Sequence, residues 1–439
     1  MSKAAEIMEK PPIITASFLV LGNVLGVGAL ALPIKTGLAG FVPALIGIIS
    51  IWAVMLITAW VIAYRIGDRE HFDIPSFYHQ EVGNIGKWVA IACNLLLLYG
   101  VLVAYLSGVS TIISSLFNLP VPEWVVTVIY FCLTSGLVLF GMKALRKGNL
   151  LVIVAIWMTF ALLVFSGSKD FTVKTLLSTY DWGMIPVGLP IVVSAFHFHN
   201  IIPTVCRALK HDQKATRKAI FLGVFLGLVI NLIWVVIVLG SLPENGAGKD
   251  TIVYADSHNW PANIPMWEIL HSELFKISGA VFALLAVTAS YMANGAGLYG
   301  FVKDLTHTYF NNSSKWLVGI LSFAPPLIIT LIYPNIFLVA LTLVGGVGES
   351  ILFVALPGFI LIRLARGKSK LLVALGAVIF LIGTFVTVYV IGEKCGLIVS
   401  KSQSESVSEQ KDSLQKKAPV ELPDANLSTR KPSGNGNSR

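Results

Sequence analysis

Eleven apolar runs, each long enough to cross a lipid bilayer, occupy most of this chain. A transmembrane helix needs about 20 consecutive apolar residues. Because hydrocarbon offers no hydrogen-bonding partner to the backbone, segments of this length are expected to be helical. The sequence therefore predicts an all-α polytopic membrane protein, embedded in the lipid bilayer, with about 11 transmembrane helices in a domain spanning residues 13–392. The predicted spans are 13–33, 41–64, 88–117, 124–142, 149–167, 184–206, 219–241, 275–301, 316–333, 335–362 and 371–392.

The composition agrees with a membrane location. Of the 439 residues, 55% are hydrophobic and 13% are charged, whereas soluble domains carry about 25% charged residues. The net charge of +9 is concentrated in loops and tail, so it indicates membrane orientation and no nucleic-acid partner is expected. The four cysteines show no CxxC spacing, which gives neither a metal site nor a disulfide framework.

The basic residues of the loops predict the orientation. With residues 1–12 placed in the cytoplasm, the inward segments carry nineteen Lys and Arg, and the outward segments before the tail carry five. The positive-inside rule therefore predicts a cytoplasmic N-terminus in a bacterial cytoplasmic (inner) membrane. An odd number of spans places the tail, residues 393–439, outside, and one miscounted span would reverse this. Its Ser, Lys, Glu and Pro content is typical of a disordered polar tail.

The first apolar run contains a glycine-rich stretch, GNVLGVGALALP, at Gly22–Pro33. Glycine exposes the backbone, and an unpaired peptide group in hydrocarbon is costly unless it faces a polar cavity. The stretch predicts a helix broken at Gly22, Gly26 and Gly28, whose free carbonyls and amides suit a substrate carrying an ammonium and a carboxylate. Close packing of helices through small residues is the alternative explanation.

A second interruption lies halfway along the chain. The sixth run, GMIPVGLPIVVSAFHFHNIIPTVCR, has polar residues at Ser194–Asn200 before Pro203, which is favoured in the first turn of a new helix. Runs one and six each begin a group of five consecutive spans. Because five is odd, the second group enters the membrane from the opposite side and is inverted relative to the first. This predicts an inverted repeat, with repeat one at about 13–167, repeat two at about 184–362 and an extra helix at 371–392.

These stretches resemble a known family. GNVLGVGALALP and the following AGFVPAL are similar to the opening of the aromatic amino-acid permeases, the hydroxy/aromatic amino-acid permease family of the amino acid/polyamine/organocation superfamily, and SAFHFHNIIPTV is similar to their sixth-helix signature. VAYLSG and FALLAVTASYMANGAGLYGFVKD resemble their third and eighth helices. The resemblance implies a leucine-transporter-like 5+5 inverted repeat with helices 1 and 6 broken, and import of aromatic amino acids.

The candidate substrate-binding residues are those at or near the two breaks. Phe196 and Phe198 flank the second break and are candidates for an apolar pocket, although aromatic residues in spans more often pack. His199 is the histidine of the family pattern, and an ionisable side chain within a span is a functional candidate by default. For His197, two residues away, a functional role and a packing role are equally supported by the sequence. The full set is Gly22, Asn23, Gly26, Gly28, Tyr105, Phe196, Phe198, His199 and Asn200.

The coupling ion is left open between proton and sodium, and no cofactor is expected. Glu349, in GGVGES of the tenth run, is the carboxylate that lies well inside an apolar span. Burial disfavours its charged form, so Glu349 and His199 are the candidate proton carriers. Asn23 and the following V-x-G-x-G instead resemble the first helix of sodium-coupled neurotransmitter-type symporters. A sodium site would then lie near Asn23, Thr288 and Ser290, although hydroxyls in membrane helices often bond to their own backbone.

These features predict a secondary active, cation-coupled amino-acid symporter that works by alternating access. No GxxxxGK[ST] phosphate-binding motif is present, which argues against direct use of ATP. The preferred substrates are tyrosine, tryptophan and phenylalanine, with small hydroxylated or other neutral amino acids as the alternative. A membrane-embedded enzyme or a sensor is the rival class, but the spans contain few ionisable groups and the polar tail is too short for a signalling domain.

Overall fold

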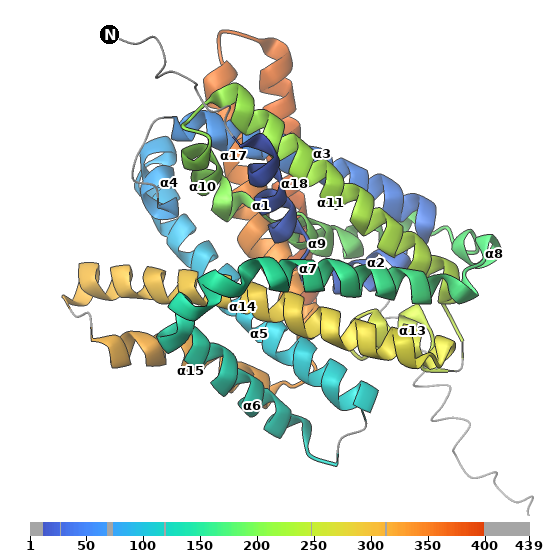
Figure 1. Ribbon diagram of the computed structural model, residues 1–439. Helices are drawn as coiled ribbons and strands as arrows, with labels where there is room; N and C mark the ends of the chain where they lie inside the picture. Colours follow the sequence, from blue (N-terminus) through green and yellow to red (C-terminus); the bar gives the residue numbers. More distant parts are fainter. Residues whose placement is uncertain are drawn as a thin grey trace, which may run out of the picture. The chain divides into compact units, whose positions relative to one another are not determined.

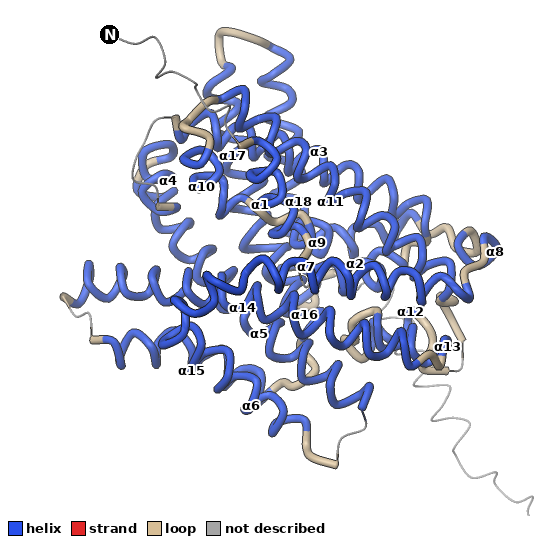
Figure 2. Tube along the Cα trace, viewed as in Figure 1, coloured by secondary structure: helices blue, strands red, loops and turns tan. Residues whose placement is uncertain are grey.

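The computed structural model describes residues 12–26, 28–67, 73–117, 120–246, 248–311 and 314–398, without the side chains of residues 141–153. The predicted cytoplasmic N-terminus before Pro12 and the predicted disordered tail beyond Ile398 lie outside the described residues. In the described part of the chain, every regular element is a helix (Figure 2). The all-helical prediction is therefore confirmed for this part.

Each of the eleven predicted apolar runs coincides with one helix or with consecutive helical segments (Figure 1). Three of the runs are divided, namely the first, the sixth and the tenth, and the fourth ends in a short π-helical turn. In chain order the segments are α1 (Ile13–Val24), α2 (Gly28–Gly37), α3 (Phe41–Ile66), α5 (Asn84–Phe117), α6 (Glu123–Gly136), η1 (Leu137–Gly141), α7 (Met142–Gly167), α9 (Ile185–Ala195), α10 (Ile202–Ala208), α11 (Gln213–Ser241), α14 (Glu273–Phe310), α15 (Lys315–Ile332), α16 (Phe337–Leu343), η5 (Val344–Ala355), α17 (Leu356–Ala365) and α18 (Lys370–Lys394).

Short helices fill the connections between these segments. Asp73 caps the first of them, since its carboxylate accepts the Ser76 N–H at 2.8 Å, a preferred arrangement at a helix start. The connecting helices are α4 (Ile74–Val82), η2 (Ser168–Asp170), α8 (Val173–Leu176), η3 (Trp182–Met184), η4 (His199–Ile201), α12 (Ile252–Ser257) and α13 (Asn263–Leu270).

Within the described residues, nine helices are long and apolar enough to cross a membrane, and the bent pair α1 and α2 raises this number to ten. The axes of α1 and α2 differ in direction by 56°. The remaining predicted span, 149–167, falls in α7, a helix of 26 residues whose first twelve side chains are outside the description.

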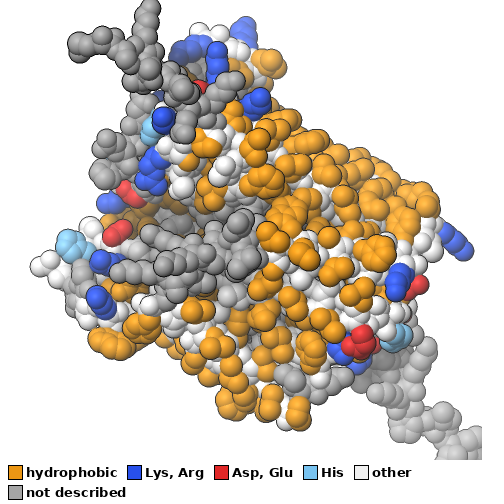
Figure 3. Space-filling view, viewed as in Figure 1, with side chains coloured by type: hydrophobic (Ala, Val, Ile, Leu, Met, Phe, Trp, Pro, Cys, Tyr) orange, Lys and Arg blue, Asp and Glu red, His pale blue; other side chains and the backbone are white. Residues whose placement is uncertain are grey.

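The outer helices expose apolar side chains. On α18 the residues Val378, Leu381, Phe385 and Val388 recur every three or four positions and are 50% to 62% exposed. This spacing makes a single apolar stripe along the helix, and such a stripe is stable only against lipid or another apolar surface. Figure 3 shows hydrophobic side chains over much of the visible face, with charged side chains gathered mainly towards two opposite ends.

The helix bundle is built from segments that are distant in the sequence. Helix α1 packs along α11, and α2 packs against α9. The long helices α5 and α14 cross the middle and contact each other (Figure 1). The π-helical segment η5 touches both α5 and α9, so the division of the tenth run, which the sequence did not predict, occurs at the centre of the bundle.

The segment between α11 and α14 folds back over the bundle. Its helix α12 follows a cap in which the Thr251 hydroxyl accepts the Tyr254 N–H at 3.2 Å. The Ala262 N–H donates to the carbonyl of Leu30 on α2 at 2.9 Å. This bond attaches the long loop to the second half of the first broken helix.

Candidate functional site

The two broken helices meet at their breaks. The first break separates Val24, the last residue of α1, from Gly28, the first residue of α2, and the second follows Ala195, the last residue of α9. A Cβ atom at residue 28 would lie 2.9 Å from the Ala195 Cα, which is too close for any side chain. Gly28 therefore has the packing role that small residues play between membrane helices, and it brings the two breaks side by side.

A cavity of about 690 Å³ opens at these breaks. Pockets for small molecules fall roughly between 300 and 1,000 Å³, so this one has room for a large amino acid. It is lined mainly by α1 and α14, with two residues each from α5 and α7, single residues from α2, α9, η4, α16 and η5, and further residues from the two breaks. Eight residues predicted from the sequence line it, namely Gly22, Asn23, Gly26, Gly28, Tyr105, Asn200, Ser290 and Glu349.

The cavity follows one half of the first broken helix and stops at the break. Ile14 and Phe18 near the beginning of α1 line it and are 71% and 55% exposed, and Gly22 is exposed as well. From Gly28 to Ile34 every residue is buried. The cavity therefore opens toward the N-terminal end of α1 and is closed on the side of α2.

Glu349 and His197 form a buried pair on the cavity wall. A carboxylate oxygen of Glu349 on η5 lies 3.2 Å from Nδ1 of His197 in the second break, and their side chains are 1% and 11% exposed. The other Glu349 oxygen, Oε2, has no hydrogen-bond partner among the described residues. An isolated buried carboxylate is costly. Whether a negative charge on Glu349 is tolerated therefore depends on His197 and on whether the pair carries a proton.

The π-helical segment η5 places Glu349 at this position. The hydroxyl of Ser350 donates to the carbonyl of Gly345 at 2.6 Å, five residues earlier. A Cβ atom at residue 345 would lie 1.9 Å from the carbonyl oxygen of Pro190, so η5 packs directly on the backbone of α9. π-helical turns inside α-helices occur frequently at functional sites, and η5, which is 12 residues long, aligns Glu349 with the second break.

A second group of polar side chains lines the cavity on α5 and α14. The amide nitrogen of Asn294 on α14 donates to the Tyr105 hydroxyl on α5 at 3.1 Å and to the Ser290 carbonyl at 3.0 Å. The ring of Tyr291 lies next to that of Tyr105, with a centroid distance of 6.4 Å and an angle of 53° between the ring planes. The neighbouring wall is apolar, formed by Val101, Ala286, Ala289, Ala293 and Leu341. The cavity thus combines polar groups at the breaks with an apolar wall carrying one amide.

Three residues predicted to bind substrate lie outside the cavity lining. Phe196 and Phe198 are fully buried, with exposed fractions of 0%, because the backbone of the break turns their rings into the core. His199 is also buried, and its Nε2 lies 3.0 Å from the Thr58 hydroxyl on α3. A structural hydrogen bond therefore holds His199, and the cavity position expected for it belongs to His197 instead.

The predicted sodium ligands are only partly brought together. Ser290 lines the cavity, and its hydroxyl would lie 3.7 Å from a Cβ atom at Gly26. Asn23 lines the cavity as well, and its side chain donates to the Leu19 carbonyl at 3.3 Å. Thr288 is outside the lining, and its hydroxyl lies 3.2 Å from the Tyr130 hydroxyl.

Sequence reasoning missed several lining residues. Asn294, Ser194 and Trp157 face the cavity, but none of them was singled out. Asn294 lies in the stretch FALLAVTASYMANGAGLYGFVKD that carried the family resemblance. Its spacing of four from Ser290 was the available signal, since residues at i and i+4 share one face of a helix.

Comparison with known proteins gives the same architecture. In three dimensions the chain is similar to MhsT in complex with L-phenylalanine, with a TM-score of 0.61, 13% identity and coverage of 85% of this chain and 98% of that one. A manganese transporter of Eremococcus coleocola has a TM-score of 0.57 at 13% identity, with coverage of 91% and 90%. At such identities the likeness concerns the fold alone, which is the leucine-transporter fold with two broken helices.

Sequence comparison is more specific. The chain is 25% identical over 362 residues to tyrosine-specific transport system 1 of Haemophilus influenzae, which covers 81% of this chain and 89% of the relative. It is 25% identical over 357 residues to a tryptophan-specific transport protein of Shigella flexneri, with coverage of 76% and 83%. The model of the tryptophan/tyrosine permease family matches residues 9–393. This chain is thus a transporter rather than an enzyme, and it belongs to the tryptophan/tyrosine permease family.

Proposed function

We propose that this protein imports tyrosine or tryptophan across a bacterial cytoplasmic membrane by alternating access, driven by protons that bind at Glu349 and His197. The observation that carries the proposal is a large cavity at two helix breaks with a buried acid–base pair in its wall. The names of the relatives, tyrosine-specific and tryptophan-specific transporters, support the substrate class.

The first break offers the groups that an amino acid's backbone requires. Helix α1 ends at Val24 with carbonyls that lack intrahelical donors, and α2 begins at Gly28 with amides that lack intrahelical acceptors, of which the Ala29 N–H donates to the Gly26 carbonyl at 3.1 Å. The negative end of one half-helix suits the ammonium, and the positive end of the next suits the carboxylate. The absence of a side chain at Gly26 leaves space for this contact.

The buried pair favours a proton as the coupling ion. If Glu349 and His197 together lose their proton, a negative charge remains on Glu349, and its surroundings leave Oε2 without a partner in the described residues. Burying such a charge is costly. Closing the cavity is therefore favoured with the proton in place. Sodium is less well served, because Thr288 lies outside the cavity lining.

The structure corresponds to the inward-facing state if residues 1–12 are cytoplasmic. The cavity opens at the N-terminal end of α1, and the positive-inside rule assigns that end to the cytoplasm. The opposite side is closed by α2 and the attached segment with α12 and α13. Substrate released from this state would enter the cell, which agrees with import.

The test uses proteoliposomes and labelled tyrosine or tryptophan. Accumulation should follow an imposed inward proton gradient, disappear with a protonophore and be indifferent to replacement of sodium by choline. Glu349→Gln should lose accumulation but retain exchange of labelled for unlabelled substrate, because exchange needs no net proton movement. Glu273→Gln, at a carboxylate whose side chain is 70% exposed on α14, is the matched control and should behave as the parent.

Two results would contradict parts of the proposal. Accumulation by Glu349→Gln at the parental level would exclude Glu349 as the proton carrier. Strict dependence of the parent on sodium would replace the proton by sodium and direct attention to Ser290 and the carbonyls near Asn23.

A further inference from the structure

Asn294 lines the cavity, and two hydrogen bonds orient its amide. The backbone carbonyl of Ser290 can only accept, so the amide nitrogen of Asn294 must face it, at 3.0 Å. The second hydrogen of that nitrogen goes to the hydroxyl of Tyr105 at 3.1 Å. Both donors are used, which fixes the choice between the two ends of the amide. Among the described residues, no donor is found for the remaining oxygen.

The surroundings make this oxygen a selective acceptor. Asn294 lines the cavity together with Ala286, Ala289 and Ala293 on the same helix, and Val101 and Leu341 lie on neighbouring helices. Such a wall accommodates an aromatic ring, and the amide oxygen is one of its few polar points, beside Ser290 and the Tyr105 hydroxyl. Asn294 is half-buried, and a ring bound in the cavity would cover its oxygen. A covered acceptor without a donor is costly, whereas one that receives a hydrogen bond is stabilising.

We propose that the Asn294 amide oxygen, held in place by Tyr105 and Ser290, accepts a hydrogen bond from the polar tip of the substrate side chain. A phenol O–H and an indole N–H both supply such a donor, and a phenyl ring supplies none. The inference rests on the proposed function, in which the cavity binds an aromatic amino acid. It goes further by naming the residue that separates tyrosine and tryptophan from phenylalanine.

The expected size of the effect follows from the loss of one hydrogen bond at a desolvated group. Leaving the acceptor unpaired costs about 1–3 kcal/mol, which corresponds to a factor of about 5 to 150 in affinity. Sites built to bond a polar substrate group reject analogues that lack it for this reason. Phenylalanine should therefore bind at least fivefold more weakly than the preferred substrate, in spite of its similar size.

The test is competition at equilibrium on the purified protein with labelled tyrosine or tryptophan. The competitors are tyrosine, tryptophan, phenylalanine, O-methyltyrosine and 1-methyltryptophan, of which the last two keep the ring but lack the donor hydrogen. In the parent, tyrosine, tryptophan or both should bind at least fivefold more tightly than phenylalanine. The same amino acid should bind more tightly than its methylated analogue by a similar factor. The methylated pair shows which of the two donors, O–H or N–H, reaches the oxygen.

Asn294→Leu removes the acceptor while keeping a similar volume. In this variant the ratio of the affinity for the preferred substrate to the affinity for phenylalanine should fall close to one. The affinity for phenylalanine itself should change by less than about threefold. Asn231→Leu is the matched control. Asn231 on α11 also donates to a carbonyl four residues earlier, that of Gly227 at 3.0 Å, but it does not line the cavity, so the preference should persist.

A second variant covers the case in which Asn294→Leu does not fold. Tyr105→Phe keeps the ring and removes the hydroxyl that holds the amide, and it should reduce the preference without abolishing binding. An unchanged preference in folded Asn294→Leu would overturn the inference while leaving the proposed function intact. If no aromatic amino acid competes in the parent, the proposed function itself fails.

Discussion

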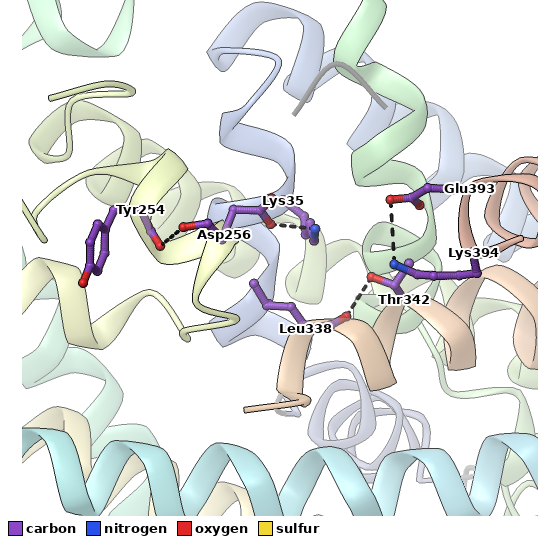
Figure 4. A network of polar contacts seen from close by, with 8 residues as sticks. Lys35, Tyr254, Asp256, Leu338, Thr342, Glu393 and Lys394 are labelled. Atoms are coloured by element: carbon purple, nitrogen blue, oxygen red, sulfur yellow. Dashed lines mark hydrogen bonds and ion pairs between the residues drawn. The ribbon is translucent and has the colours of Figure 1, made fainter. Parts of the chain in front are cut away.

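The ammonium of Lys35 lies 2.6 Å from a carboxylate oxygen of Asp256, and this ion pair joins α2 to α12 (Figure 4). The two side chains are only 13% and 10% exposed. Together with the hydrogen bond from the Ala262 N–H to the Leu30 carbonyl at 2.9 Å, the pair attaches the folded-back segment to the second half of the first broken helix. It closes the cavity on the side opposite to its opening.

Asp256→Asn should therefore favour opening on the α2 side. Breaking a largely buried pair leaves the Lys35 charge without its partner and destabilises the closed arrangement, which shifts the population toward the other state. In a background without native cysteines, a cysteine at Asn23 should become more reactive toward a membrane-impermeant thiol reagent added from that side. The Lys35→Asp/Asp256→Lys double variant should restore the parental rate.

The matched control for this prediction is Lys394→Gln. Lys394 lies 3.7 Å from Glu393 on the adjacent position of α18 (Figure 4), far in sequence from the folded-back segment. Its loss should leave the reactivity at residue 23 unchanged. Equal reactivity in the Asp256→Asn variant and the parent would show that the ion pair does not hold the closed side.

Gly28→Ala should damage the site, and Gly22→Ala should not. A Cβ atom at residue 28 would lie 2.9 Å from the Ala195 Cα, whereas one at residue 22 has nothing within 4 Å. Forcing the two breaks apart is expected to cost about 1–3 kcal/mol. Thermal unfolding of the purified variants and binding of labelled substrate should both show the difference. Similar losses in the two variants would mean that the contact between the breaks does not matter.

Gly26→Leu should block substrate binding without unfolding the protein. A Cβ atom at Gly26 would sit at ordinary contact distance, 3.7 Å, from the Asn23 carbonyl oxygen and the Ser290 hydroxyl. A methyl group is therefore accommodated, but a leucine side chain would fill the part of the cavity between α1 and Ser290. Gly26→Ala is the control and should retain most of the binding. Substrate binding by folded Gly26→Leu at the parental affinity would place the site elsewhere.

His197→Gln and His199→Gln should have different consequences. His197 contacts Glu349 on the cavity wall, whereas His199 contacts the Thr58 hydroxyl in the core. The first variant should reduce proton-driven accumulation with little change in stability. The second should lower stability by about 1–2 kcal/mol, since it loses a buried hydrogen bond, and should keep its proton dependence. Proton-driven accumulation and thermal unfolding of both proteins distinguish these outcomes.

The lengths and interruptions of the apolar runs were enough to predict the fold. A run of about 20 apolar residues has to be helical because hydrocarbon satisfies no backbone group. Gly22–Gly28 and Ser194–Asn200 were recognisable because glycines and polar residues are costly in such a run unless it is broken. No sequence pattern marked the π-helical segment η5, since it differs from an α-helix only in the carbonyl to which each N–H donates.

The orientation of side chains within the second break was decided by the tertiary structure. His197 and His199 are both polar, two residues apart and within one motif, so local sequence does not distinguish them. Their rings both stack on Phe353 of η5, at centroid distances of 5.2 and 4.9 Å. Only the packing of η5 and α3 around the break directs one histidine to Glu349 and the other to Thr58.

The sequence by itself determined that Glu349 is a carboxylate inside an apolar span, because charge is rare there and each instance is conspicuous. It did not determine the partner of Glu349, nor the pairing of Asn294 with Tyr105 across α14 and α5. Such contacts join residues separated by more than a hundred positions. They depend on how the helices pack, which is set by the sum of many small contacts rather than by any local pattern.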